Sequence, residues 1–248
     1  MISLCIPTYN RVKLVLESFS KVIENDIITE IIIVDDNSEN SIFEKLEKEI
    51  NELKNNKIKL FRNTENKKAF LNKLECVRIS ENDWIILLDS DNILTQDYID
   101  SIPKELDKKT FYLPSHAVCD SPFLNYDKFS NKSINKLEYK TLSQTGDSND
   151  QLKFATMLNT GNYLVNKYTY IESIAKEEDI LEPYALDPFY QIFLGFKNID
   201  NFKLKVVDNM NYYHRLHTNS DESGSYYSQN SKKSDNLLIY LKSKIIEI

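Results

Sequence analysis

The sequence predicts an α/β fold in which a mostly parallel central sheet is flanked by helices. Through the first hundred residues, apolar segments too short for helices alternate with segments of helical period, which is the pattern of βαβ units. The chain has 248 residues, of which 41% are hydrophobic and 28% are charged, enough to build a packed core. A disordered tail or a coiled coil is therefore excluded.

The first βαβ unit is the clearest part of the pattern. Residues 2–6 form a short apolar strand that is expected to end in a turn at Pro7. Residues 31–34 are β-branched and apolar on both faces, as expected for a central strand covered by helices on each side. The helix between them has one apolar face, formed by Val15, Phe19, Val22 and Ile23.

The next two units repeat this order. A helix begins near residue 40, where Asn40 or Ser41 is expected to cap its N-terminus. Residues 58–61 form a third strand and residues 84–88 a fourth. The apolar faces of the two helices are Ile42, Leu46, Ile50 and Leu53 in the first, and Phe70, Leu74 and Val77 in the second.

After Pro103 the periodicity weakens. The polar stretch 127–151 is expected to be a loop or a lid, and the polar segment 220–231 is expected to be mobile. An amphipathic helix from about residue 235 ends the chain. The other elements expected here are strands at 111–113, 163–165, 204–207 and 210–213 and helices at 168–175 and 188–194.

Composition and charge exclude several classes of protein. Asp and Glu outnumber Lys and Arg by 38 to 31, giving a net charge of -7, which argues against general nucleic-acid binding. The three cysteines form no CxxC pair, so neither a disulfide framework nor a zinc site is indicated. No segment approaches the roughly 18 apolar residues of a membrane span, and no signal peptide is recognisable. We expect a cytoplasmic protein without a transmembrane segment.

Each of the four predicted parallel strands is followed by polar residues. These segments are 7–11, 35–38, 63–68 and 89–92, and two of them contain paired carboxylates. Ligands of open parallel sheets bind beyond the carboxyl ends of the strands, where turn amides and helix N-termini converge. The sequence therefore predicts a functional site at this edge of the sheet.

Asp89 and Asp91 stand two residues apart after a buried strand. In extended geometry both carboxylates would point to the same side, with their Cα atoms roughly 6 to 7 Å apart. At an effective dielectric of about 20 their repulsion would be about 2 kcal/mol, which a cation or hydrogen-bond donors would offset. Carboxylate oxygens suit Mg²⁺ or Mn²⁺, and these ions keep positions for substrate phosphates. The pair is a candidate divalent-metal site.

Together these segments resemble the family 2 glycosyltransferases of the GT-A fold, which transfer a sugar from a nucleotide diphosphate sugar. The resemblance extends over about residues 2–220 and implies a Rossmann-like sheet with a smaller acceptor-side region. The matching segments are 6–11, 33–38, 87–92, 186–188 and 212–220, in the family's order and spacing. The implied parts are a nucleotide-sugar-binding half at 1–102, an acceptor-side half at 103–219, and a polar linker with the C-terminal helix at 220–248.

The resemblance implies how the donor is bound. Tyr9 would stack on the nucleobase beside Pro7, and Asp36 would accept a base N–H. The resemblance also favours a UDP-sugar as the donor. The other donor contacts that it implies are Thr8, Arg11, Lys68, Asp89 and Ser90.

The resemblance further implies an inverting, metal-dependent reaction. Asp91 would ligate Mn²⁺ or Mg²⁺ between the two phosphates, with Asp89 near the ribose or the metal and His217 as a further ligand. Asp187, just before a proline at a helix start, would be the general base that deprotonates an acceptor hydroxyl. The acceptor would be a glycan or another hydroxyl compound.

Two segments depart from the family pattern. Relatives usually show a glycine and an arginine within the stretch that corresponds to 66–73, where this chain has no glycine. Lys68 or Lys73 would replace the arginine, although an ammonium lacks the bidentate fork. Leu186 also stands where an acidic residue commonly precedes the base.

Two other functions remain open. A nucleotidyltransferase would share paired carboxylates and a nucleotide fold, but residues 7–11 lack the glycine- and basic-rich loop such enzymes usually need. A catalytically inactive sugar-nucleotide or glycan-binding module would use the chain's 15 Tyr and 12 Phe as stacking surfaces. The C-terminal helix would pack on the domain, contact a membrane surface or pair with a second copy.

Overall fold

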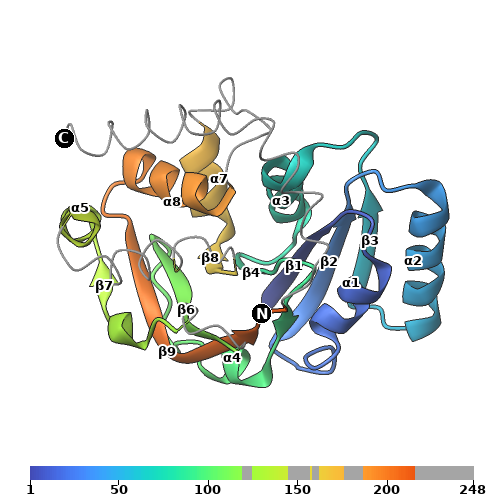
Figure 1. Cartoon of the computed structure of the whole chain (residues 1–248), viewed down its shortest axis with the longest axis horizontal. Helices are drawn as coiled ribbons and strands as arrows, with labels where there is room; N and C mark the ends of the chain where they lie inside the picture. Colours follow the sequence, from blue (N-terminus) through green and yellow to red (C-terminus); the bar gives the residue numbers. More distant parts are fainter. Residues whose placement is uncertain (119–124, 145–156, 158–161, 176–186, 216–248) are drawn as a thin grey trace.

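A computed structural model of the chain describes residues 1–118, 125–144, 157, 162–175 and 187–215 (Figure 1). Its strands are β1 (Ile2–Thr8), β2 (Ile28–Asp35), β3 (Ile58–Arg62), β4 (Trp84–Leu87), β5 (Ile93–Leu94), β6 (Thr110–Val118), β7 (Ser133–Ile134), β8 (Leu164–Asn166) and β9 (Lys203–Tyr213). Its helices are α1 (Val12–Phe19), α2 (Asn40–Leu53), α3 (Lys68–Ile79), α4 (Gln96–Asp100), α5 (Lys136–Gln144), α7 (Lys167–Ala175) and α8 (Asp187–Asn198), with a 3-10 turn, η2 (Asp127–Phe129). The predicted α/β fold is confirmed.

The described strands form one sheet in the order β3-β2-β1-β4-β8-β6-β9-β5, with β7 paired to β9. β1 is parallel to both β2 and β4, and β2 is parallel to β3, as the βαβ pattern predicts. In the other half, β8 runs antiparallel to β4 and β6, whereas β6 and β9 are parallel. The direction in which strands are added reverses at β1, so the ligand position typical of such sheets lies between the ends of β1 and β4.

Helices cover both faces of the sheet, as residues 31–34 predict. Ile31 and Ile33 pack with residues of α1, α2 and α4 on one face. Ile32 and Val34 pack with residues of α3, α7 and α8 on the other face. Figure 1 shows the resulting three layers, with α3, α7 and α8 together on one side of the strands.

Pro7 continues β1 instead of ending it in the expected turn. Cys5 O accepts a hydrogen bond from Leu88 N at 3.0 Å, and Pro7, two residues further on, faces the same neighbour. Because β4 has already ended at Leu87, the missing N–H of Pro7 costs no ladder hydrogen bond. The strand therefore extends to Thr8, at the edge where the site was predicted.

The stretch 127–151 was expected to be a loop or a lid, but its described part contains η2, β7 and α5. Tyr139 of α5 is buried, and its ring lies 5.7 Å from that of Phe193 and 5.2 Å from that of Phe196 in α8. The apolar face of α5 thus depends on partners far away in the sequence, which local periodicity cannot reveal.

Two smaller expectations from the sequence also differ from the structure. The strands expected at 204–207 and 210–213 are one strand, β9, whose apolar pattern is interrupted by the exposed Asp208 and Asn209. The cap of α2 is Glu39, without a side-chain hydrogen bond, so neither Asn40 nor Ser41 caps this helix.

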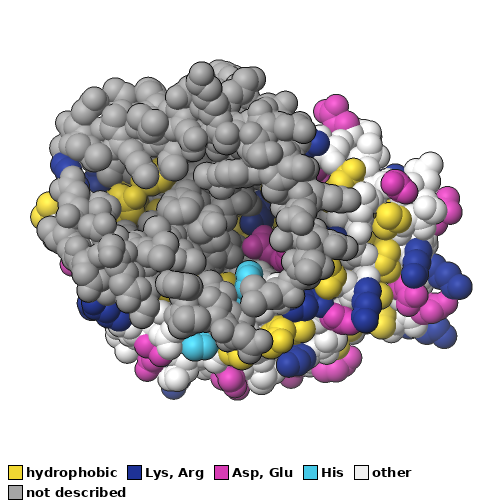
Figure 2. All heavy atoms as spheres, viewed as in Figure 1, with side chains coloured by type: hydrophobic (Ala, Val, Ile, Leu, Met, Phe, Trp, Pro, Cys, Tyr) yellow, Lys and Arg dark blue, Asp and Glu magenta, His cyan; other side chains and the backbone are white. Residues whose placement is uncertain are grey.

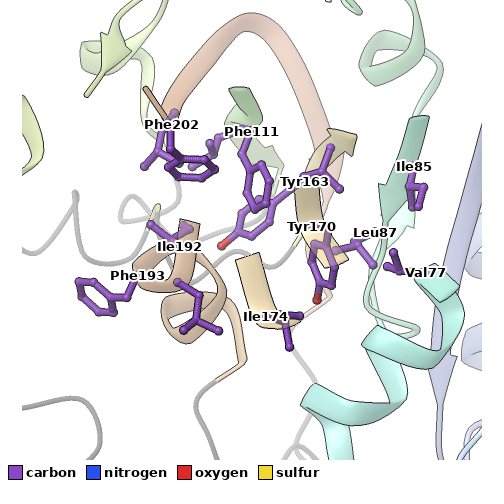
Figure 3. Close-up of a cluster of buried hydrophobic side chains, with 14 of the residues drawn as sticks. Val77, Ile85, Leu87, Phe111, Tyr163, Tyr170, Ile174, Ile192, Phe193 and Phe202 are labelled. Atoms are coloured by element: carbon purple, nitrogen blue, oxygen red, sulfur yellow. The ribbon is translucent and has the colours of Figure 1, made fainter. Parts of the chain in front are cut away.

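Gly195 of α8 lies against the ring of Phe202, and a Cβ atom at Gly195 would come within 2.4 Å of that ring. The ring is held in place because Phe111 and Phe196 meet it edge-on at 4.8 and 5.0 Å (Figure 3 shows Phe111 and Phe202). Gly195→Ala would gain about 1 kcal/mol of helix propensity, but overpacking costs about 1 to 3 kcal/mol. We therefore expect urea unfolding to show a lower free energy of unfolding for this variant. In a Phe202→Leu background the same substitution should cost less; an equal cost there would contradict the explanation.

Glu30 is a buried carboxylate near the start of β2. It accepts hydrogen bonds from Ser3 Oγ at 2.6 Å, Lys59 Nζ at 2.8 Å and Glu81 N at 3.0 Å. Burial raises the pKa of Glu30, but these donors outweigh burial and leave the pKa below its usual value. A carboxyl whose pKa is lowered by folding stabilises the fold above its unfolded pKa, and this contribution is lost as the pH falls through the folded pKa.

Glu30→Gln is therefore expected to lower the free energy of unfolding at pH 7 by about 1.5 to 3 kcal/mol. The deficit relative to the wild type should shrink as the pH falls below about 4.5, the usual pKa of a glutamate side chain. Denaturant unfolding between pH 3 and pH 7 measures both effects. A deficit that stays constant over this range would contradict the assignment.

Candidate active site

The polar ends of the strands meet at one edge of the sheet, as expected. Asp36 N donates to Thr8 O at 2.8 Å, and β4 flanks the other side of β1. Asn63 N donates to Asp35 O at 2.9 Å, which brings the end of β3 to the same edge. In Figure 2, acidic, basic and histidine side chains are visible close together near the centre of the face shown.

The two carboxylates at the end of β2 have different partners. Asp35 closes its own turn, because it accepts hydrogen bonds from the main-chain N and the Oγ of Ser38. Asp36 faces the start of α3 and accepts from Lys67 N, Lys68 N and Asn63 Nδ2, each at 2.8 Å. A carboxylate has about four acceptor positions, so these donors occupy three of them.

Lys68 occupies a backbone position that favours glycine. Its φ is 69°, and Lys67 before it has φ -82° and ψ -9°. A residue in the right-handed region followed by one in the left-handed region directs successive main-chain N–H groups at one anion, which here is the carboxylate of Asp36.

Lys73 lies further along α3 and is buried, and its Nζ is 2.7 Å from Asp89 Oδ1. Of the two lysines that the sequence left open, the structure places Lys73 against the acidic pair.

Asp89 and Asp91 lie on a turn, which we call the acidic turn (residues 89–92), so the expected extended geometry is wrong. Asn92 N donates to Asp89 O at 2.9 Å and closes the turn directly after β4. Asp91 Oδ2 lies 2.6 Å from Arg11 Nη1. With Lys73 beside Asp89, each carboxylate has a cationic partner, which offsets the repulsion between the two.

The acidic turn offers the oxygen donors that Mg²⁺ and Mn²⁺ prefer. The side chains of Asp89 and Asp91 are 31% and 22% exposed, so both are accessible to a ligand. Within the described part of the chain, no group of three or more His, Cys, Asp or Glu residues is placed to hold a metal. The expected further ligand, His217, lies outside the described residues. The two carboxylates fit an ion that takes its remaining ligands from phosphate or water.

The expected donor contacts at the ends of β1 and β4 differ in exposure. Tyr9 is 41% exposed, so its ring is open to stacking. Thr8 is only 4% exposed, and its Oγ1 has no hydrogen-bond partner among the described residues. The side chains of Pro7 and Ser90 are buried. Because a buried hydroxyl without a partner costs free energy, Thr8 is well suited to a polar ligand contact.

Asp187 is the first residue of α8, in agreement with its predicted place at a helix start. The structure does not describe its side chain, and Leu186 lies outside the described residues. The role of Asp187 as general base therefore stays a prediction.

Sequence reasoning missed Asn162, a buried residue just before β8. Its Oδ1 accepts from Asp89 N at 3.0 Å, and its main-chain O accepts from the Tyr98 hydroxyl at 3.1 Å. Burial raises the pKa of Tyr98 and that of Tyr212, which also hydrogen-bonds Asn162, so both phenols stay protonated. Asn162 thus connects the acidic turn to buried tyrosines by hydrogen bonds. No local sequence motif indicates this role.

A comparison with known families identifies the chain. Residues 3–162, more than half of the sequence, match the family described as Glycosyl transferase family 2. The chain belongs to glycosyl transferase family 2. The family that the motifs predict is thereby confirmed.

Solved structures of glycosyltransferases share the fold of this family 2 chain at low sequence identity. S. aureus TarS 1-349 in complex with UDP-GlcNAc has a TM-score of 0.61 at 15% identity, over 90% of this chain and 60% of that chain. GalNAc-T7 with UDP, GalNAc and Mn²⁺ has a TM-score of 0.62 at 13% identity, over 88% of this chain and 44% of that chain. The mannosyltransferase PcManGT from Pyrobaculum calidifontis, with GDP-Man and Mn²⁺, has a TM-score of 0.57 at 10% identity, over 88% and 57% of the two chains.

The family 2 chain therefore spans about 60% of the TarS 1-349 chain. A comparison with curated proteins gave no match. None of the described helices is long and apolar enough to cross a membrane. The C-terminal helix expected from about residue 235 lies outside the described residues.

Proposed function

We propose that the chain is an inverting, metal-dependent glycosyltransferase that moves a sugar from a UDP-sugar to a hydroxyl of a glycan or another acceptor. The observation that carries this proposal is the position of the acidic turn, with its two cation-paired carboxylates, beside the end of β1 in a family 2 fold. The complexes of similar fold support it, since they contain UDP, UDP-GlcNAc or GDP-Man, two of them with Mn²⁺.

Residues at the ends of β1 and β2 would bind the nucleoside. Tyr9 offers an exposed ring, and stacking on an aromatic side chain contributes about 1 to 3 kcal/mol per base. Asp36 keeps about one acceptor position, which matches the single imide N–H of uracil. This match supports UDP over a guanine nucleotide, whose base presents two neighbouring donors.

The acidic turn and its cations would bind the diphosphate. Asp89, Asp91 and His217 are the residues that would hold Mn²⁺ or Mg²⁺, and a bound ion neutralises charge on the leaving diphosphate. Arg11 and Lys73 add fixed positive charge at the same place. Charged groups held in position before the reaction stabilise developing negative charge without further reorganisation.

Asp187 would act on the acceptor. Its place at the N-terminus of α8 favours the ionised carboxylate, because the helix dipole is positive there. It would take the proton of the acceptor hydroxyl while the oxygen attacks the anomeric carbon on the side opposite the departing nucleotide. The anomeric configuration would thereby be inverted.

The test is a panel of nucleotide sugars offered to the full chain with Mn²⁺, Mg²⁺ or a chelator, with nucleotide release as the readout. We expect release from a UDP-sugar and its loss in chelator. Release that persists in chelator would contradict metal dependence, and release from GDP-sugars alone would contradict the uridine assignment. Binding of sugar nucleotides without any release would favour a binding module, and pyrophosphate release from a nucleoside triphosphate would favour a nucleotidyltransferase.

A further inference from the structure

We infer that Arg215 is a positioning residue that fixes the main chain of the acidic turn and thereby holds Asp89 and Asp91 ready for a divalent ion. Arg215 lies after the end of β9, far from the acidic turn in sequence, and its side chain is only 12% exposed. The inference rests on the proposed function, because it concerns the proposed metal pair.

The evidence is that Arg215 faces the carbonyl oxygens of the acidic turn. Its Nε donates to Asp91 O at 2.5 Å, and its Nη2 lies 3.4 Å from Ser90 O and 3.5 Å from Asn92 O. The remaining carbonyl, that of Asp89, accepts from Asn92 N at 2.9 Å. Each of the four carbonyls of the acidic turn therefore faces a donor, and three of them lie against one guanidinium.

The same guanidinium is anchored on α1. Its Nη2 donates to Leu14 O at 2.8 Å, and its Nη1 forms an ion pair with Glu17 Oε2. These contacts spread over the three nitrogens of a planar group, which a lysine ammonium cannot reproduce because its three donors share one nitrogen. Arg215 is thus a rigid connection between α1 and the acidic turn.

The acidic turn needs such a connection because it lies between β4 and β5, outside the hydrogen-bonding ladder of the sheet. Arg11, just before α1, pairs with the carboxylate of Asp91. Arg215 donates to the main-chain carbonyl of the same residue. Metal ligands must keep their geometry within about 0.5 Å, and they do so only if their support is locked. Loss of the Arg215 contacts would let the two carboxylates move relative to each other.

The test compares the wild type with Arg215→Lys and with Glu30→Gln as a control. Glu30→Gln also removes a buried charged contact, but near the start of β2, at the edge of the sheet away from the acidic turn. The measurements on the full chain are Mn²⁺ binding by electron paramagnetic resonance, thermal unfolding, and hydrogen exchange of the peptide that contains residues 89–92. We expect Arg215→Lys to bind Mn²⁺ at least about tenfold more weakly and to exchange faster at residues 89–92. Glu30→Gln should unfold at a lower temperature yet bind Mn²⁺ as the wild type does.

Wild-type Mn²⁺ affinity in a folded Arg215→Lys protein would overturn the inference. If the wild type itself binds no Mn²⁺, the metal part of the proposed function fails. Hydrogen exchange then decides the inference about Arg215. Unchanged exchange at residues 89–92 in Arg215→Lys overturns this inference. Should Arg215→Lys not fold, Arg215→Gln takes its place with the same expected outcomes, since its neutral amide loses the ion pair with Glu17 and cannot connect α1 to the acidic turn. Equal weakening of Mn²⁺ binding by Glu30→Gln would show a merely structural effect and also overturn the inference.

Discussion

Asp91→Asn is expected to lower the rate of nucleotide-sugar turnover by about 10²- to 10³-fold, the usual effect of removing one group that stabilises charge in the transition state. The amide keeps the shape of the side chain but removes one of the two negative charges of the acidic turn. It also leaves Arg11 without its carboxylate partner. Nucleotide release from a UDP-sugar at saturating Mn²⁺ measures the effect.

The fold should tolerate Asp91→Asn, because a partly exposed ion pair contributes only about 1 kcal/mol or less. Asp100→Asn, at an exposed position in the neighbouring helix α4, is the matched control and should keep wild-type activity. Turnover by Asp91→Asn within about twofold of the wild type would remove Asp91 from the metal site.

Asp187→Asn is expected to lower sugar transfer by about 10²- to 10⁴-fold, the range typical of a general base. In contrast to Asp91→Asn, this change should leave the affinities for Mn²⁺ and for the donor as they are, since Asp187 is proposed to act on the acceptor hydroxyl. Transfer kinetics together with Mn²⁺ titration separate the two effects. If Asp187→Asn instead weakened donor binding at an unchanged rate of transfer, the carboxylate would belong to the donor site.

Much of the first half of the fold could be predicted because its signals are local. The β-branched run 31–34 alternates between the two core clusters, as a strand covered on both faces must. The second half gave weaker signals because its elements are short or gain their apolar partners from distant segments. Tyr139 of α5 packs on α8, and the two-residue strand β7 exists only through its pairing with β9.

The place where the candidate residues meet could also be predicted, but the geometry among them could not. Polar strand ends and the rule for parallel sheets located Asp36, Asp89 and Asp91 at one edge. The sequence could not show that residues 89–92 form a turn, because a turn and an extended chain can carry the same residues. Nor did it show that Lys73 and Asn162 contact Asp89, because both come from other elements and reach the acidic turn only through the fold.

The antiparallel strand β8 has a consequence for anyone who shortens this chain. It covers the outer edge of β4 over residues 84–86, and β5 likewise pairs with β9. A fragment limited to residues 1–102 would keep the acidic residues that follow β2 and β4 but would leave a row of open N–H and C=O groups along β4. Such a bare edge recruits strands from other molecules, so the fragment would self-associate before it could act as a small nucleotide binder.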